Sequence, residues 1–352
     1  MPGFRRRCFL ESGVQFSTLF QQIINGLSLG SVYALIAVGY SLVYSILSFS
    51  NFAHGGFLVV GGYICYGLLT GFEAVVFGER LFTVPAFNIW IASFSALAGA
   101  GVIAVLTERL AYKPIREHTA MTLYLLIASM GVSIVIENIF VIVAGGRFRA
   151  LPQDIFPSNF RDILPSFLFD LWDLLLPIFS NLRDILPPAF LDLWKNVTLS
   201  PLDVISLIFA VVFLGGLQLF LTRTRWGLAI RAAACDLRTA GLMGVNVSFL
   251  IAIVFFVAGL LAAVGGIFLS VRYTLYPQLG GITTKAFVAA VIGGLGSLPG
   301  AVVGSLILGL AEMLTAGFIS SQMRDLVVFS MLVIMLLVKP AGFFGKQISD
   351  KI

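Results

Sequence analysis

The sequence predicts an all-α integral membrane protein: a polytopic helical bundle of about eight transmembrane helices with re-entrant or broken segments. Hydrophobic residues make up 59% of the 352 residues and charged residues only 11%, whereas a soluble domain carries about 25% charged residues. The mean hydropathy is +1.02. The apolar residues also form runs close to the roughly 20 residues that a membrane-crossing helix needs.

Nine apolar stretches are candidate spans. A crossing helix has roughly 17–25 residues, so the seventh and ninth stretches are short and are expected to extend into flanking residues or to turn back. The basic opening MPGFRRRC has no small-residue cleavage site soon after it, so we expect an uncleaved first span rather than a signal peptide. The stretches are residues 23–46, 52–69, 86–106, 120–144, 202–221, 249–271, 286–298, 301–318 and 326–338.

Short basic loops predict which span ends face the cytoplasm, because such loops are enriched in Lys and Arg. Residues 108–118, 223–238 and 339–351 are basic and are all expected on the cytoplasmic side. The arginines at 5–7 favour the same side for the N-terminus. This placement requires stretch 52–69 to be re-entrant, which leaves eight crossings with both ends inside. Nine crossings with an outside N-terminus are the alternative.

The spans divide the chain into three regions: N-terminal membrane segments (1–144), an external insert (145–200), and C-terminal membrane segments (201–352) that include a polar cytoplasmic loop (223–248). The insert contains a tandem repeat, with NFRDILPSFLFDLW starting at residue 159 and NLRDILPPAFLDLW at residue 181. Two copies are too few for a repeat array. We expect two short amphipathic helices at the outer interface, with Trp172 and Trp194 at headgroup depth. Docking of an external partner is the alternative.

The polar cytoplasmic loop is expected to contain a short helix over residues 229–240. This stretch is dense in Ala, Leu and Arg, which favour helix, and Gly241 and Gly244 can end it. Arg231 and Arg238 are seven residues apart and should share one face of that helix. Small alanines give the helix a slim profile suited to a groove in another protein. An ordinary loop is the alternative.

The stretch SFSNFAHGGF interrupts apolar sequence with polar residues and glycines. Irregular backbone at membrane depth is tolerated only where it is buried in protein or lines a watery cavity. Asn51, His54 and Gly55 are therefore candidates for a substrate pathway, where the ends of half-helices offer backbone groups to a zwitterion. Alternatively, Asn51 and His54 satisfy local backbone groups at a tight turn.

Three further residues are pathway candidates. Glu137 is a carboxylate toward the outer end of the fourth stretch, and such a residue usually faces the protein interior or a pathway. A pairing or snorkelling role is the alternative. Gly296 and Gly300 flank Pro299 in a glycine-rich segment, where small residues allow either close helix packing around a kink or a substrate contact.

No enzyme signature is present. The sequence lacks a G-x-x-x-x-G-K-[ST] loop, a Ser-His-Asp set and metal-ligand spacing, so no cofactor or metal is expected in this chain. Cys8, Cys65 and Cys235 are too far apart for a redox motif. The net charge of +5 is accounted for by cytoplasmic loops facing membrane lipid, and binding of nucleic acid is not expected.

Several long stretches together resemble the permease subunits of branched-chain amino-acid ABC transporters, the LivH type. They are QQIINGLSLGSVYALIAVGYSLVYSI, NFAHGG at residues 51–56, ERLAYKPIR, RAAACDLRTAGLMGVN, and KAFVAAVIGGLGSLPGAVVGSLILGLAE at residues 285–312. The likeness covers nearly the whole chain except the insert. Two positions depart from the family: Cys235 stands where a Glu is usual before Asp236, and Gly56 where many relatives carry Glu.

The resemblance implies a multi-pass protein of the bacterial cytoplasmic (inner) membrane. It implies as partners a related second permease, two cytoplasmic ATPase subunits that bind ATP, and a periplasmic solute-binding protein. It also implies that residues 231–240 are the coupling helix, which seats in a cleft of the ATPase. The residues assigned to this coupling loop are Arg231, Ala232, Asp236, Arg238, Gly244 and Asn246.

The function expected from the resemblance is the permease of an ABC importer for branched-chain or other neutral amino acids. A urea or short-amide permease of the same family is one alternative. A stand-alone secondary transporter is another, although such proteins usually carry a set of buried ion-coupling acids, and Glu137 is the only carboxylate placed well inside a span.

Overall fold

The computed structural model describes residues 2–71, 73–76, 79–83, 85–118, 122–151 and 200–345. Within them it contains seven helices long and apolar enough to cross a membrane. This confirms the predicted polytopic helical fold. The long helices are α1 (Pro2–Leu47, apolar over Ser17–Leu47), α3 (Ile89–Thr107, continued by a π-helical turn η1, Glu108–Tyr112, and by α4, Lys113–His118), α5 (Thr122–Ala144), α8 (Pro201–Arg223), α11 (Val247–Tyr273), α13 (Leu298–Phe318) and α14 (Arg324–Val338, preceded by η5, Ser321–Met323).

Two shorter segments complete the bundle. Helix α2 (His54–Thr70) has 17 residues, and α12 (Thr283–Gly293), which follows the 3₁₀ turn η4 (Pro277–Ile282), has only 11. These correspond to the second and seventh candidate stretches, the places where broken or re-entrant segments were expected. A small antiparallel hairpin, β1 (Glu73–Val76) with β2 (Glu79–Thr83), joins α2 to α3 and was not predicted.

Helix α1 is the central element of the bundle. Nearly all of its apolar stretch is buried, whereas most of α5 and α14 is exposed on the outside of the bundle. Glycines bring α1 and α13 into close contact: a Cβ on Gly26 would lie 2.9 Å from Cα of Leu310, and one on Gly30 equally close to Cα of Leu306. Small residues at four-residue spacing allow this approach. The pairing also shows that α1 and α13 run antiparallel.

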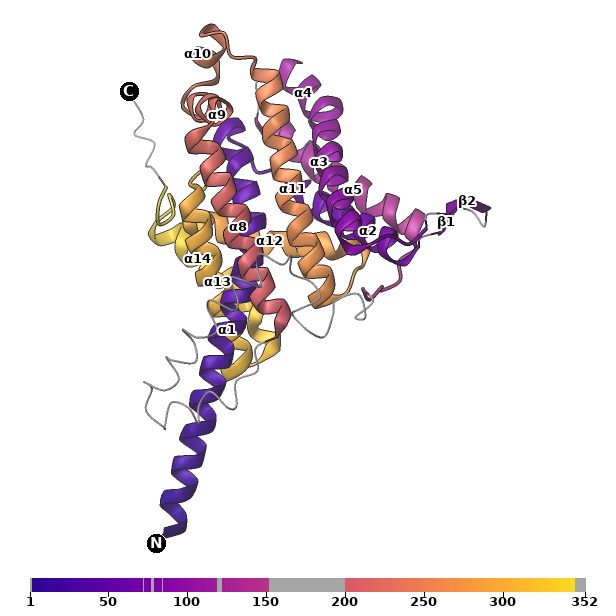
Figure 1. Cartoon of the computed structure of the whole chain (residues 1–352). Helices are drawn as coiled ribbons and strands as arrows, with labels where there is room; N and C mark the ends of the chain where they lie inside the picture. The colour runs from indigo at the N-terminus through magenta and orange to yellow at the C-terminus, as the bar shows by residue number, and fades with distance from the viewer. Residues whose placement is uncertain are drawn as a thin grey trace.

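The N-terminus does not lie where it was expected. Helices α4, α9 (Arg225–Cys235) and α10 (Leu237–Leu242) lie at one end of the molecule, here called the basic end, whereas α1 begins at the opposite end (Figure 1). The expectation that the N-terminus lies on the same side as the basic loops is therefore wrong, and its position agrees with the alternative of an outside N-terminus. The physical reason is that the segment containing α2 does not return to the basic end. Among the described residues, seven helices are long enough to cross a membrane, rather than eight or nine.

The external insert falls almost entirely outside the described residues, and so do the tandem repeat, Trp172 and Trp194. Its described margins are residues 145–151 and Ser200. Arg149 pairs with Leu275 through two backbone hydrogen bonds of 2.8 Å. The chain that leaves α5 is thus anchored to the segment that follows α11.

Candidate functional site

Two helix starts meet inside the bundle, at a place called here the junction. Helix α2 begins at His54, and η4 leads into α12 at Thr283. A Cβ on Gly55 would lie 2.7 Å from the carbonyl oxygen of Gly280 and 2.8 Å from Oγ1 of Thr283, and one on Gly280 would lie 2.9 Å from the carbonyl oxygen of Gly55. Only glycine fits at either position. The junction therefore brings together the positive ends of two helix dipoles.

Asn51 holds the bend that leads into α2. Its side-chain oxygen accepts hydrogen bonds from the backbone N–H of Ala53 (3.2 Å) and from the hydroxyl of Tyr112 (2.8 Å). The backbone N–H of Phe52 donates to Oγ of Ser129 at 3.1 Å. These bonds agree with the local capping interpretation of Asn51. Its buried Nδ2 has no hydrogen-bond partner among the described residues.

His54 is completely buried, and its surroundings differ from a capping site. Its ring centroid lies 4.7 Å from that of Tyr40, and Gly39 makes room for it, because a Cβ there would lie 2.6 Å from Cε1 of the imidazole. Neither ring nitrogen of His54 nor the Tyr40 hydroxyl makes a hydrogen bond of normal geometry within the described part of the chain. Burying unpaired polar groups is costly. This cluster is therefore the strongest candidate for contact with a polar ligand.

Glu137 reaches the same junction. Its carboxylate accepts a hydrogen bond from Ser133 at 3.3 Å, and a Cβ on Gly280 would lie 3.2 Å from its Oε1. Ile136, one residue earlier on α5, packs directly against Gly56. The carboxylate thus lies beside the turn that leads into α12, which agrees with the interpretation of Glu137 as a residue facing the protein interior or a pathway.

Gly296 and Gly300 do not belong to the junction. Gly296 has a φ of +83° in the turn between α12 and α13, close to Tyr44 and Ser45, and Gly300 packs against the backbone of Gly293. This turn follows the end of α12, whereas the junction lies at its start. The structure agrees with the packing interpretation of both glycines.

The segment Gly342–Gly345 has a structural role. The backbone N–H groups of Phe343 and Phe344 donate to the carbonyl oxygens of Ile292 and Gly293, each at 2.9 Å. A helix leaves its last carbonyls without intrahelical partners. This segment therefore caps the C-terminal end of α12.

A buried ion pair stabilises the contact between α12 and α13. Nζ of Lys285 lies 2.8 Å from a carboxylate oxygen of Glu312 and 2.8 Å from one of Asp325. The hydroxyl of Tyr33 donates to the other oxygen of Glu312 at 3.0 Å. Glu312, ambiguous in the sequence, is therefore a fully paired structural group.

The predicted coupling helix is divided in two. Helix α9 ends at Cys235, Asp236 is extended with a φ of −159°, and α10 starts at Leu237. The carboxylate of Asp236 accepts from the backbone N–H of Arg238 at 2.9 Å and from the Thr239 hydroxyl. The prediction of one continuous helix, with Arg231 and Arg238 on a common face, is therefore wrong. An Asp that caps a new helix start competes with continuation of the preceding helix.

The caps fix the shape of this loop. Hydrogen bonds from the Thr239 hydroxyl and from the backbone N–H groups of Thr239 and Arg238 hold the pKa of Asp236 below its usual value. The cap is thus present at neutral pH and is lost only as the pH falls through the lowered pKa. Asn246 caps α11 by accepting from the backbone N–H of Phe249 at 3.1 Å. Two of the six assigned coupling residues therefore have structural roles.

The outward face of the loop is mixed in polarity. Arg231, Ala232 and Arg238 are exposed, whereas Ile230, Ala233 and Ala240 are buried against the bundle. Leu242 and Met243 are 82% and 81% exposed at the tip after α10. Gly244 follows with a φ of +88°, a conformation that glycine adopts at no steric cost. Leu242 and Met243 were missed in the sequence because apolar residues are common near spans.

Other residues of the junction were also missed. Tyr40, Gly280 and Thr283 lie around His54 and Gly55. The signal for Gly280 and Thr283 was the stretch YPQLGGITT at residues 276–284, whose Pro and Gly pair mark a break. The seventh candidate stretch was placed three residues too late, at 286 instead of the start of α12 at Thr283. Among the described residues, no three His, Cys, Asp or Glu side chains gather as a metal site would require.

The chain matches a known protein family over most of its length. The family described as "Branched-chain amino acid transport system / permease component" matches residues 22–336. The match includes the junction and the loop with α9 and α10. No solved structure is significantly similar to this chain.

Curated relatives have the same kind of name. The chain is 34% identical to the high-affinity branched-chain amino acid transport system permease protein LivH of Escherichia coli strain K12, over 96% of this chain and 99% of the relative. It is 33% identical to the permease protein BraD of Pseudomonas aeruginosa, over 94% and 97%. A probable branched-chain amino acid transport permease protein LivH of Methanocaldococcus jannaschii is 25% identical over 83% and 79%.

Proposed function

The chain belongs to the family of permease components of branched-chain amino acid transport systems, and from that premise we propose that it forms the solute passage of an ABC importer for branched-chain or other neutral amino acids. It is a multi-pass protein of the inner membrane that works with partner components. The family is a transport family and not an enzyme class.

The passage runs through the junction. The single observation that carries this proposal is the meeting of two helix starts beside buried polar atoms of His54, Tyr40 and Asn51 that make no hydrogen bond of normal geometry within the described residues. The positive ends of helix dipoles favour a carboxylate. The carboxylate of Glu137 beside Gly280 favours an ammonium group. The carboxylate and the ammonium group of a zwitterion each therefore find a complementary charge at the junction. An uncharged amide has neither group and gains nothing from these charges.

The loop with α9 and α10 docks on a cytoplasmic ATPase. Support comes from the exposed Leu242 and Met243 beside exposed Arg231 and Arg238, because apolar anchors with arginine at their rim are typical of protein interfaces. Gly227 packs α9 against the carbonyls of Phe220 and Leu221 at the end of α8. Movement of α9 is thereby passed to α8. A related second permease and a periplasmic solute-binding protein complete the proposed importer.

Uptake by the assembled importer tests the function. The chain, co-expressed with its partner subunits and reconstituted with the solute-binding protein, is expected to accumulate labelled leucine, isoleucine and valine in an ATP-dependent manner. Labelled urea serves as the competing solute. Uptake of urea with no uptake of leucine would reject the amino-acid proposal, and leucine uptake that survives ATP depletion would favour a stand-alone transporter.

A further inference from the structure

We infer that a cavity between α1, α8 and α11 is a second binding site, which holds a zwitterionic amino acid with an apolar side chain before it reaches the junction. This inference rests on the proposed function. The cavity has a volume of about 190 Å³, below the roughly 300–1,000 Å³ of pockets for drug-sized ligands. It therefore suits one small solute. It is lined by Ser28, Val32, Ser200, Leu202, Asp203, Ser206, Phe268, Val271 and Arg272.

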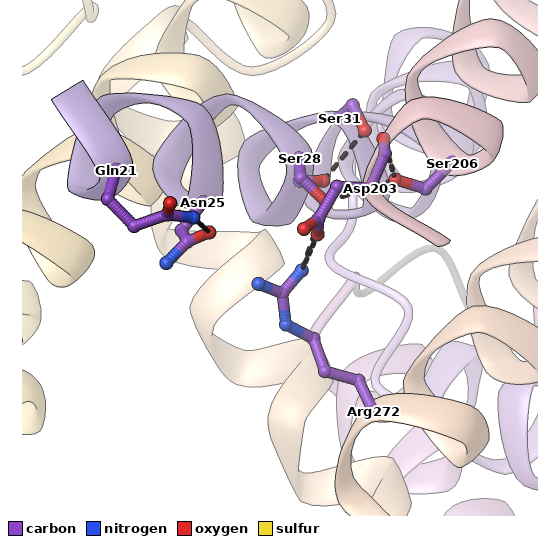
Figure 2. A network of polar contacts seen from close by, with 7 residues as sticks. All are labelled: Gln21, Asn25, Ser28, Ser31, Asp203, Ser206 and Arg272. Atoms are coloured by element: carbon purple, nitrogen blue, oxygen red, sulfur yellow. Dashed lines mark hydrogen bonds and ion pairs between the residues drawn. The ribbon is translucent and has the colours of Figure 1, made fainter. Parts of the chain in front are cut away.

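The cavity contains one charge of each sign. Arg272 lies in the last turn of α11 and Asp203 in the first turn of α8, and Figure 2 shows the guanidinium extended toward the carboxylate. The guanidinium nitrogen and the carboxylate oxygen are 3.5 Å apart, with side-chain exposures of 27% and 13%. A solute carboxylate can bind Arg272 and a solute ammonium group Asp203, each by a charge-assisted hydrogen bond.

Hydroxyl groups complete the polar side. Ser28 donates to Asp203 at 2.6 Å and shares a hydrogen bond of 3.1 Å with Ser206. Arg272 donates to the Ser28 hydroxyl at 3.1 Å. All of these side chains gather between the three helices (Figure 2). Serine hydroxyls both donate and accept, so they can bond either end of a zwitterion.

Four residues of the lining are apolar. Val32, Leu202, Phe268 and Val271 together form the apolar wall of the cavity. Pockets for small molecules combine such a wall with a few converging polar groups. An aliphatic side chain on the solute would cover this wall, whereas urea or a short amide would leave it bare. The lining thus favours an amino acid such as leucine.

The ion pair differs from a structural brace. Nζ of Lys285 and a carboxylate oxygen of Glu312 approach to 2.8 Å, the distance of a charge-assisted hydrogen bond. The 3.5 Å between Arg272 and Asp203 is longer. In addition, the space beside this pair is not filled by described side chains. If the ion pair only held the helices together, its two charged groups would be expected to approach to hydrogen-bond distance, and neighbouring side chains would be expected to fill the space beside them.

The position of the cavity fits an entry site. Val32 lines the cavity and Tyr40 lines the junction, both on α1. Eight residues of helix span about 12 Å. The cavity lies nearer the end where α8 begins, opposite the basic end with α9 and α10 (Figure 1). A solute entering from that end would reach the cavity first and the junction second.

The test uses the complete importer in proteoliposomes with saturating leucine-loaded solute-binding protein. Leucine transported per ATP hydrolysed is measured, together with co-purification of the ATPase. Asp203→Asn and Arg272→Gln are each expected to lower the ratio by at least about tenfold while assembly stays normal, because each removes one charge-assisted contact. The double variant with Asp203→Arg and Arg272→Asp separates the two roles. This variant can form an ion pair between α8 and α11 again, but its positive and negative charges have exchanged positions. Its ratio of leucine transported to ATP hydrolysed is therefore expected to stay low.

A graded series at Val271 tests the apolar wall without touching a charge. Val271→Leu and then Val271→Phe are expected to lower the ratio progressively by filling the cavity, whereas Val303→Phe, on the partly exposed face of α13, is the matched control. Recovery of the wild-type ratio in the charge-exchanged double variant, or a flat Val271 series, would overturn the inference. If the wild-type importer itself moves no leucine, the proposed function fails first; if the wild type and all variants move leucine equally, only the cavity inference fails.

Discussion

At the scale of single residues, the junction depends on the absence of side chains as much as on their presence. Gly55 and Gly280 face one another with no room for a Cβ on either, and Gly39 leaves the space that the His54 ring occupies. Asn51, His54, Gly55 and Glu137 could be predicted because polar residues and paired glycines stand out in apolar sequence. Tyr40 could not, because a tyrosine in a span is ordinary and only its neighbours reveal its unpaired hydroxyl.

Gly55→Ala is expected to destabilise the permease by about 1–3 kcal/mol, because the methyl group must displace backbone rather than a flexible side chain. The matched control is Gly131→Ala on α5, where no atom lies within 4 Å of the added Cβ. This control should be neutral or stabilise by up to about 1 kcal/mol, since alanine favours helix. Thermal unfolding of the purified variants measures both. Equal stability of the two variants would contradict the close approach.

At the scale of elements, the sequence predicted correctly which stretches are helical, but it did not predict where a helix is interrupted. Ala, Leu and Arg correctly predicted helix on both sides of Asp236, but the capping role of its carboxylate divides the helix into α9 and α10. Likewise, the glycine-rich segment was predicted to be broken, and it contains the short α12 followed by α13. The exact break depends on which backbone groups find partners, as Phe343 and Phe344 do at the end of α12.

Leu242→Asp combined with Met243→Asp is expected to reduce co-purification of the ATPase by on the order of tenfold or more, since losing an apolar anchor at an interface typically costs about 2 kcal/mol. Insertion into the membrane should be unchanged, because both side chains are exposed. Met323→Asp is the matched control. Met323 is also exposed, but it belongs to η5, which follows the C-terminal end of α13 and lies far along the chain from α9 and α10. ATPase recovery at the wild-type level with the double variant would exclude this tip as the docking surface.

At the scale of the whole molecule, the described residues form seven helices long enough to cross a membrane, together with the shorter helices α2 and α12. The central position of α1 follows from its pairing with α13 and α11 through glycines, and these contacts join residues too far apart in the chain for hydropathy to reveal them. The orientation of the bundle rests on the basic loops, which agree with one another. The arginines at 5–7 did not follow the same rule.

Labelling with a membrane-impermeant maleimide tests this arrangement. Exposed Cys235, on α9, is expected to react only after permeabilisation. Phe148→Cys, at an exposed position beyond α5, should react in intact cells when Cys8 and Cys235 are replaced by Ser. Buried Cys65 gives the background. Labelling of Cys235 in intact cells would reverse the orientation.

The sequence by itself determined that this protein is a helical membrane bundle, where its spans lie, and which loops are basic, because these properties follow from local hydrophobicity and charge. It also marked the polar interruption at residues 51–56. Only the tertiary structure decided that α2 and α12 begin at a common point, that Glu137 faces that point, and that Asp203 and Arg272 share a cavity. These arrangements join residues far apart in the chain, and they depend on glycine-permitted contacts between helices whose distances no local pattern encodes.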